Sequence, residues 1–419
     1  MMEIKIPYGH GSETIDCPEE HLVGVRFPNE VPKRDEHTIL QEAITNPIGA
    51  GPLEDFLADS PEVLFVVNDA TRPTPTARIL DHLAGEIEGG RPVHFLVATG
   101  AHTPPTPAEC KMIFGPMFER FQKVISIHDA QAESKMVHLG ITPRGTPLAL
   151  SRRVVEAPKI VAISSVEPHY FAGYTGGRKS FFPGAAAFST IEHNHRLALE
   201  EGASPLVLEG NPVHEDLAEA MGALEEKEIY SFQVVLDQFH RICAASAGSL
   251  EGTFAAAMQK AREVFSVKVH ERADIVVTVA HAPMDIDLYQ SHKAIEHGRL
   301  ILKEGGIIIL VSQCPKGVGN KGFYRLLCRA ADPEEVFKLI EKSYCLGDHK
   351  AAKIADLAMR AQMWGVTDLD PKILEQAFIR PYPDLQGALS AAIKEKGPHA
   401  RVVFLMNGTI TVPTIGGDS

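Results

Sequence analysis

The chain has 419 residues, of which 44% are hydrophobic and 23% charged, and its formal net charge is −13. This length predicts two domains rather than one core, and the acidic balance argues against broad binding to nucleic acid or to an anionic membrane. No apolar run is long enough to span a bilayer, the N-terminus lacks the pattern of a signal peptide, and no Cys-x-x-Cys pair suggests a zinc ribbon or a dithiol redox motif. We therefore expect a cytoplasmic protein whose six cysteines are reduced.

In the first half of the chain, short apolar strands alternate with helices. After short alternating stretches within residues 3–27, which predict strands or a hairpin, the pattern predicts helices over 37–43, 53–58 and 76–88 and strands over 63–67, 93–98 and 160–164. Each of these three strands ends in a polar loop rich in glycine or proline. Because ligands bind beyond the carboxyl ends of parallel strands, these loops share one site if the strands are neighbours.

A second α/β pattern follows a helix predicted over 253–264 and a change of composition at 267–273, which we interpret as a hinge. It predicts strands over 274–279, 306–312 and 401–406, and helices up to about residue 303, over 334–344, over 351–363 and over 388–396. The expected fold is two α/β domains with a ligand cleft between them, an N-terminal domain of residues 1–266 and a C-terminal domain of residues 271–398. The last stretch, 399–419, joins one of the two sheets, and a return to the N-terminal domain is one candidate.

The segment 164–196 shows neither a helical nor a strand period until about Thr190, which predicts a long ordered loop of the kind that is usually functional. Its turn contains Tyr174, Gly176 and Gly177, where the backbone can approach a ligand closely. Lys179 follows as a point charge or an amine nucleophile. Ser189 and Glu192 match a capping box that opens a helix carrying His193 and His195. These histidines are two residues apart, so they lie on different faces and are not expected to hold one metal together.

Each candidate residue also has a purely structural interpretation. Asp69 can cap the next helix and pair with Arg72, His102 can be a surface residue, and Lys293 can be an exposed helical lysine. Gly317 and Gly319 form a G-x-G without the rest of a dinucleotide fingerprint. Three histidines (His102, His169 and His195) and a lysine in the exit loops of neighbouring strands nevertheless favour catalysis or metal binding, since an imidazole both takes and gives protons near neutral pH and binds nickel or zinc.

With these residues laid out, the sequence resembles the nickel-pincer-nucleotide lactate racemase family. The motifs that carry the resemblance occur in order over most of the chain: DATRPTP at 69–75, ATGAH at 98–102, EPHYFAGYTGGRK at 167–179, PG at 183–184, TIEHNH at 190–195 and DLYQSHK at 287–293. Several are long and specific. One departure is Thr103, which stands where the family motif commonly has arginine and puts local substrate or cofactor contacts in doubt.

The resemblance implies a role for each matching residue. Lys179 would attach the cofactor, a pyridinium-3-thioamide-5-thiocarboxylic acid mononucleotide with nickel, and His195 would be the protein ligand of the metal. His102 and His169 would be the acid/base pair. The remaining residues would contact the nucleotide (Asp69, Thr71, Arg72, Tyr174, Gly176 and Gly177) or the substrate (Arg72, Tyr289, Gln290 and Lys293).

The implied function is racemisation or epimerisation of a small 2-hydroxy acid, with lactate as the default. The substrate would transfer a hydride from Cα to the cofactor and take it back on the other face, while the two histidines handle the hydroxyl proton. Proteins of cofactor synthesis would load the enzyme, and neither nucleic acid nor membrane is an expected partner. Malate would need one more basic contact, for which Arg178 and Lys316 are candidates. A non-catalytic nickel- or nucleotide-binding protein of the same fold and a zinc-dependent hydrolase are the alternatives.

Overall fold

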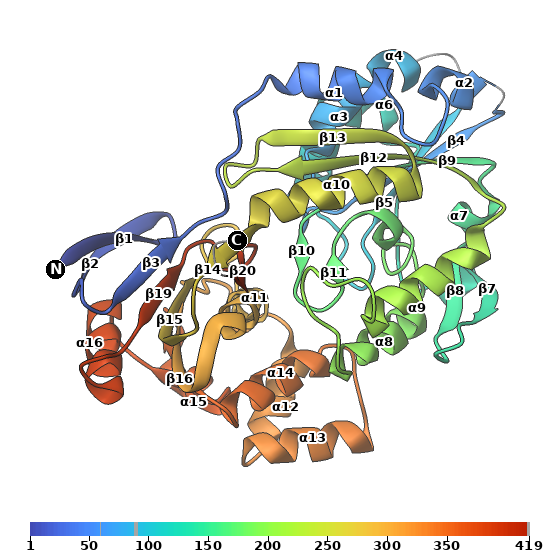
Figure 1. Ribbon diagram of the computed structural model, residues 1–419. Helices are drawn as coiled ribbons and strands as arrows, with labels where there is room; N and C mark the ends of the chain where they lie inside the picture. Colours follow the sequence, from blue (N-terminus) through green and yellow to red (C-terminus); the bar gives the residue numbers. More distant parts are fainter. Residues whose placement is uncertain (59, 88–90, 417–419) are drawn as a thin grey trace. The chain divides into compact units, whose positions relative to one another are not determined.

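The computed structural model describes residues 1–58, 60–87 and 91–416 and divides the chain into two compact units (Figure 1). The central unit is Glu30–Glu263, and the terminal unit combines Met1–Asn29 with the chain from Val264 onward. No helix in the described part of the chain is both long enough and apolar enough to cross a membrane.

A six-stranded sheet forms the middle of the central unit. Its order is β13-β12-β9-β4-β5-β6, and every pair is parallel except β12–β13. The inner strands are near-continuous apolar runs, as expected for strands covered on both faces. The strand bounds are β4 Val63–Asn68, β5 Val93–Ala98, β6 Ile125–Ile127, β9 Lys159–Ser165, β12 Glu228–Leu236 and β13 Ile242–Ser249.

Helices cover both faces of this sheet. Val63, Phe65 and Val67 of β4 point into one core that also contains apolar residues of the helices between residues 36 and 121, whereas α10 runs along the opposite face of β12 and β13 (Figure 1). The helices are α1 Glu36–Thr45, α2 Leu53–Ala58, α3 Thr76–His82, α4 Ala84–Ile87, α5 Pro107–Phe114, α6 Phe118–Phe121, α7 Arg152–Glu156, α8 Phe188–Arg196, α9 Pro212–Met221 and α10 Leu250–Phe265, with two small hairpins, β7 Met136–Ile141 with β8 Pro147–Ser151 and β10 Pro168–His169 with β11 Gly173–Tyr174.

The terminal unit has a second six-stranded sheet, with order β18-β17-β16-β15-β19-β3 and parallel pairs throughout. Alternate residues of β15 pack into two cores on opposite faces of the sheet. Val276 packs with residues of α11–α15, whereas Ile275 and Val277 pack with residues of α16 and the hairpin β1–β2. The strands are β1 Met2–Tyr8, β2 Gly11–Cys17, β3 Leu22–Arg26, β14 Ser266–Val269, β15 Ala273–Val279, β16 Leu302–Val311, β17 Gln362–Val366, β18 Ile379–Pro381, β19 Val402–Leu405 and β20 Val412–Ile415; the helices are α11 Leu288–Gly298, α12 Lys321–Arg329, α13 Pro333–Lys342, α14 Asp348–Ala358, α15 Pro371–Gln376 and α16 Leu385–Lys396.

The prediction of two α/β domains is confirmed, but the boundaries differ from 1–266 and 271–398. β3 pairs with β19, which in turn pairs with β15, so the first 29 residues and the last strand both belong to the terminal unit. The return of 399–419 to the first domain is therefore wrong for the described residues, and 417–419 lie outside them. A strand pattern predicts a strand but not its partner, which is why sequence placed residues 1–29 with the wrong sheet.

Two helix predictions were also too long. The helix predicted over 351–363 ends at Ala358, and Met363 lies in β17 as a buried sheet residue. The helix predicted over 76–88 divides at Leu83 into α3 and α4, and residue 88 lies outside the described residues.

Candidate active site

The exit loops of β9, β4 and β5 begin at one edge of the central sheet. β4 lies between the other two strands, and Val67 is paired with both Val97 and Ile163. The condition set from sequence, that these three strands are parallel neighbours, is thus met. The loops carrying Asp69 and His102 and the segment 164–196 consequently start side by side.

Asp69 and His102 form a hydrogen-bonded pair at this edge. The Asp69 side chain is 4% exposed and its Oδ2 lies 2.8 Å from Nδ1 of His102, while Oδ1 accepts the Thr71 hydroxyl at 2.7 Å. Burial raises the pKa of Asp69, but hydrogen bonds and charge from His102, the Thr71 hydroxyl and the charge of Arg72 together lower this pKa below its ordinary value. An ionised carboxylate can only accept, so His102 Nδ1 carries a proton, and the neutral ring has its lone pair on Nε2.

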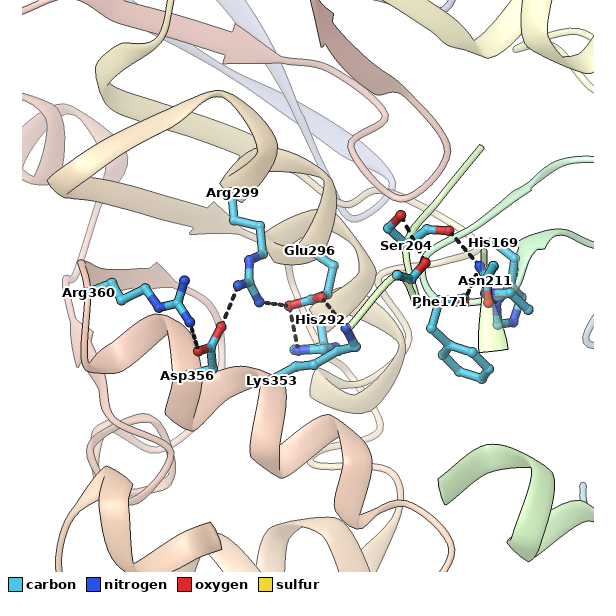
Figure 2. Close-up of polar contacts among 12 residues, drawn as sticks. His169, Phe171, Ser204, Asn211, His292, Glu296, Arg299, Lys353, Asp356 and Arg360 are labelled. Atoms are coloured by element: carbon cyan, nitrogen blue, oxygen red, sulfur yellow. Dashed lines mark hydrogen bonds and ion pairs between the residues drawn. The ribbon is translucent and has the colours of Figure 1, made fainter. Parts of the chain in front are cut away.

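His169 has the opposite arrangement. It lies in β10 and is 8% exposed, and its Nδ1 accepts the backbone N–H of Ala172 at 3.3 Å (Figure 2). Its ring stacks on Tyr170, with centroids 5.2 Å apart, and meets Phe171 edge-on at 4.5 Å. Because Nδ1 is the acceptor, the neutral ring of His169 carries its proton on Nε2. In their neutral forms, the two imidazoles of the central unit are thus opposite tautomers, with the lone pair on Nε2 in His102 and the proton on Nε2 in His169.

Lys179 and His195 come together around Phe171. Lys179 lies in the 3-10 helix Gly177–Ser180, and its Nζ is 5.6 Å from the centroid of Phe171, whose ring meets that of His195 at 5.2 Å. Burial and the positive charges of Lys179, His102 and Arg72 lower the pKa of His195 to about 3. His195 is therefore neutral at physiological pH, which is the form that coordinates a metal.

Contacts to neighbouring elements set the orientation of α8. Asn194 is buried and donates to Asp216 Oδ2 at 2.8 Å, whereas His193 is exposed and its ring bonds the carbonyl of Ser189 at 2.8 Å. His193 therefore faces away from the buried side that contains Asn194. The predicted capping box is wrong, because α8 begins at Phe188 with Ala187 as its N-cap and no side-chain cap bond.

The early start of α8 has a tertiary cause. The backbone N–H of Ala187 donates to Ala149 in β8, and that of Phe188 donates to Ala130, both at 2.9 Å. These bonds fix the chain before Ser189 is reached, so Ser189 falls inside the first turn.

The glycines of the Tyr174–Gly177 turn are required by packing within the protein. Gly176 and Gly177 have φ of 78° and 53°, in the region that favours glycine. A Cβ at Gly176 would lie 2.6 Å from Val166, and one at Gly177 would lie 2.7 Å from the Phe254 ring. Contact of this backbone with a nucleotide stays a prediction, because these contacts alone account for both glycines.

Asn211 is a supporting residue that we did not single out from sequence. Its side chain is fully buried, and its Nδ2 lies 2.9 Å from the carbonyl oxygen of Phe171 and 3.2 Å from that of Ser204 (Figure 2). Its Oδ1 accepts the N–H of Val213 and caps α9. The signal was present as Asn211-Pro212, a favoured N-cap followed by proline at the first helical position.

The predicted substrate-binding residues Tyr289, Gln290 and Lys293 lie in the terminal unit, on α11. Asp287 caps this helix by accepting the N–H of Gln290 at 2.8 Å, and the N–H of Tyr289 donates to Val318 at 3.2 Å. Burial and the charge of Asp287 raise the pKa of Tyr289 to about 12, so its phenol is protonated.

The lone G-x-G, Gly317 to Gly319, contacts the N-terminal end of α11. The N–H of Leu288 donates to the carbonyl of Gly317 at 3.0 Å, and a Cβ at Gly319 would lie 2.5 Å from the Asp287 carboxylate. These glycines shape the loop that contacts the start of α11, which is a structural role for the motif.

A buried charged network holds another face of α11 against α14. The Glu296 carboxylate is 4% exposed and lies 3.4 Å from Arg299, 3.5 Å from Lys353 and 3.6 Å from His292 (Figure 2). Burial raises the pKa of Glu296, but the charges of these neighbours outweigh burial and bring it to about 2. Glu296 is therefore ionised and links the two helices.

The donor set around His195 suits a metal that brings most of its own ligands. Among residues 1–58, 60–87 and 91–416, no group of three or more His, Cys, Asp or Glu side chains is placed to hold a metal ion. His195 offers one neutral imidazole, and Lys179, close to the same Phe171 ring, offers a primary amine for attachment. A metal organised by an attached organic group fits these residues, whereas a zinc site built from protein ligands finds no support in them.

Comparisons with known proteins agree on one family. A model of the lactate racemase N-terminal domain matches residues 8–205, and a model of the lactate racemase C-terminal domain matches residues 268–412. The chain is 32% identical to a lactate racemase of Thermoanaerobacterium thermosaccharolyticum, over 94% of each protein, and 28% identical to one of Lactiplantibacillus plantarum, over 97% of this chain and 99% of that protein.

Solved structures give the same result. The apoprotein of the lactate racemase from T. thermosaccharolyticum superposes with a TM-score of 0.91 at 30% identity, covering 99% of this chain and 100% of that one. A Thermotoga maritima protein shares the fold at a TM-score of 0.69 and 15% identity, covering 91% of this chain and 98% of that one. The chain belongs to the lactate racemase family and is an isomerase.

Proposed function

We propose that the protein racemises or epimerises a small 2-hydroxy acid, with lactate as the first substrate to test because both curated relatives carry its name. The observation that carries the proposal is that the central unit holds two imidazoles, His102 and His169, whose Nδ1 atoms are hydrogen-bonded within the protein, so that proton transfer is assigned to Nε2. Inversion of a carbinol centre requires one group to take the hydroxyl proton on one face and another to give a proton on the other face. The hydrogen bond that His102 Nδ1–H donates to Asp69 leaves the Nε2 of the neutral His102 ring as the proton acceptor.

In this proposal His102 removes the hydroxyl proton at Nε2, and the Asp69 carboxylate stabilises the imidazolium that results. His169 gives a proton to the product oxygen from its imidazolium form, and loss of that proton leaves a neutral ring. In the reverse direction the two histidines exchange roles.

The group that we propose to be resident is the nickel-pincer nucleotide, attached through the Nζ of Lys179 and bound at nickel by His195. When bound, it supplies reversible acceptance of a hydride. Asp69, Thr71 and the turn with Tyr174, Gly176 and Gly177 would contact its nucleotide part, and proteins of cofactor synthesis would load it. The neutral state of His195 and the half-buried position of Lys179 support this assignment.

Arg72, Gln290 and Lys293 would orient the substrate, with Arg72 holding a carboxylate through its planar fork and Tyr289 lining the site. For a dicarboxylate such as malate, Lys316 is the better of the two basic candidates, because the Arg178 guanidinium already lies 2.7 Å from His214 and over the Phe254 ring. The six free cysteines are in keeping with a reducing compartment, which stays part of the proposal.

The test is chiral product analysis on protein co-produced with the cofactor-synthesis proteins. L- and D-lactate and a panel of other 2-hydroxy acids are incubated with wild type, His102→Ala, His169→Ala, His195→Ala and His193→Ala. His193 is the matched control, because it lies on the same helix as His195 but is exposed. We expect His193→Ala to interconvert the enantiomers normally and the other three variants to lose at least about 100-fold in kcat, the lower range for removing a general acid or base.

Full interconversion by both His102→Ala and His169→Ala would refute the two-base proposal. Loaded cofactor with no turnover of any 2-hydroxy acid would favour a non-catalytic binding protein.

A further inference from the structure

Lys350 contacts a predicted substrate residue from a neighbouring helix. It lies in the first turn of α14 and is 2% exposed. Its Nζ donates to the backbone carbonyl of Tyr289 on α11 and lies 3.6 Å from the centroid of the Tyr289 ring. One amino group therefore contacts both the backbone and the side chain of the same residue.

These contacts restrain Tyr289 in two ways. A carbonyl oxygen has two lone pairs, so Tyr289 can accept Nζ in addition to a helical N–H, which ties the first turn of α11 to α14. The Lys350 Nζ covers one face of the Tyr289 ring, and the Phe323 ring from α12 meets Tyr289 edge-on at 5.5 Å. The ring is thus held between α12 and α14.

A lysine at this position is not explained by packing alone. Burial and the charge of Lys293 lower the pKa of Lys350 well below its ordinary value. A methionine would fill similar volume without the cost of desolvating an amine. What the lysine adds is the set of contacts made by its Nζ.

Three side chains lie within one turn of α11: Tyr289, Gln290 and Lys293. The helix N-terminus itself is not open to an anion, because the N–H groups of Leu288, Tyr289 and Gln290 already donate to Gly317, Val318 and Asp287. Recognition of a substrate by this turn therefore depends on how its side chains are aimed. The contacts of Lys350 with Tyr289 restrain that orientation.

We propose that Lys350 is a positioning residue for the substrate, acting by fixing Tyr289 and, through the first turn of α11, the side chains of Gln290 and Lys293. This inference rests on the proposed function, in which those three residues orient a 2-hydroxy acid. It assigns Lys350 no contact with the substrate.

The chain offers a matched control one turn further along α14. Lys353 also reaches from α14 to α11, where it pairs with Glu296 at 3.5 Å. It joins the same two helices without contacting Tyr289. Its removal therefore weakens the docking of the helices but not the restraint on the first turn of α11.

The kinetic test compares Lys350→Met, Lys350→Arg and Lys353→Met in cofactor-loaded enzyme with the preferred 2-hydroxy acid. We expect Lys350→Met to raise KM about tenfold with a smaller change in kcat, because loss of the hydrogen bond to Tyr289 misaligns the side chains that bind the substrate. Lys350→Arg, which keeps a hydrogen-bond donor, should show only part of this increase in KM. Lys353→Met lowers Tm but leaves KM within about twofold of wild type.

Hydrogen exchange supplies a readout that needs no activity. In Lys350→Met, amides 288–293 should exchange about tenfold faster, while Lys353→Met should not single out this peptide. Unchanged KM and unchanged exchange in folded Lys350→Met would overturn the inference. If wild type interconverts no 2-hydroxy acid, the proposed function fails instead, and the exchange result alone then decides whether Lys350 orders this turn.

Discussion

Replacing Asp69 by asparagine tests whether its carboxylate prepares His102 for catalysis. The substitution keeps the size of the side chain and its bond to Thr71 but removes the charge that holds Nδ1–H of His102 at 2.8 Å. A hydrogen bond to a charged group contributes about 1.5–3 kcal/mol, so its loss from the charged state of His102 lowers kcat about 10- to 150-fold. The effect is expected in kcat rather than KM, because the imidazolium forms only as the reaction proceeds.

The assay is initial rates of L-to-D and D-to-L conversion at saturating substrate, with cofactor content measured on the same samples. Asp237→Asn is the control, since Asp237 is another buried aspartate after a strand of the central sheet but pairs with Arg241 instead of a histidine. We expect Asp237→Asn to lower Tm and leave kcat near wild type. A fully loaded Asp69→Asn enzyme with wild-type kcat would refute the role given to this pair.

Three further predictions concern the scaffold, and each is tested by measuring Tm or the free energy of unfolding. Gly319→Ala places a Cβ 2.5 Å from the Asp287 carboxylate at a residue with φ of 77°. It should lower the free energy of unfolding by about 1–3 kcal/mol and raise KM. Gly416→Ala is the control, because a Cβ there meets nothing within 4 Å, and it should change stability little. Asn211→Ala removes the donor to the carbonyls of Phe171 and Ser204 and should lower the free energy of unfolding by about 1–3 kcal/mol. Asn320→Ala removes only the cap of α12 and should lower it by about 1 kcal/mol. Equal losses of stability in the two variants would contradict the reasoning. Burial lowers the pKa of His297 to about 4, so between pH 7 and 5 this residue binds a proton in the unfolded chain, where its pKa is about 6.5, but not in the folded chain. Lowering the pH from 7 to 5 should therefore reduce the free energy of unfolding by about 2 kcal/mol through this residue. In His297→Asn the free energy of unfolding should fall less over the same pH range.

Much of the fold could be predicted because the inner strands are buried on both faces. The runs 63–67, 93–98 and 160–164 are continuously apolar, so their bounds differ from β4, β5 and β9 by at most one residue at either end. β13 escaped prediction because it is built largely of alanine and serine, which give little hydrophobic pattern. The place of β3 depended on pairing with a strand almost 400 residues away, which no local pattern contains.

The site was predictable to the extent that strand order determines it. Neighbouring parallel strands bring Asp69 and His102 to the same edge, and their pairing follows from that geometry. The sequence could not predict which ring nitrogen of each neutral histidine carries the proton. This depends on whether Nδ1 faces a carboxylate, as in His102, or a backbone N–H, as in His169. The contact of Lys350 with Tyr289 joins two helices far apart in sequence and needed the structure.

Intact-mass spectrometry with metal analysis tests the central proposal most directly, on protein from a host shown to load a known member of the family. Wild type should carry a nucleotide-sized adduct that maps to Lys179, with stoichiometric nickel. His195→Ala should keep the adduct and lose nickel, His193→Ala should keep both, and Lys179→Ala should lose the adduct. An unmodified, nickel-free wild-type chain from that host would contradict the proposed cofactor and, with it, the hydride-transfer racemase.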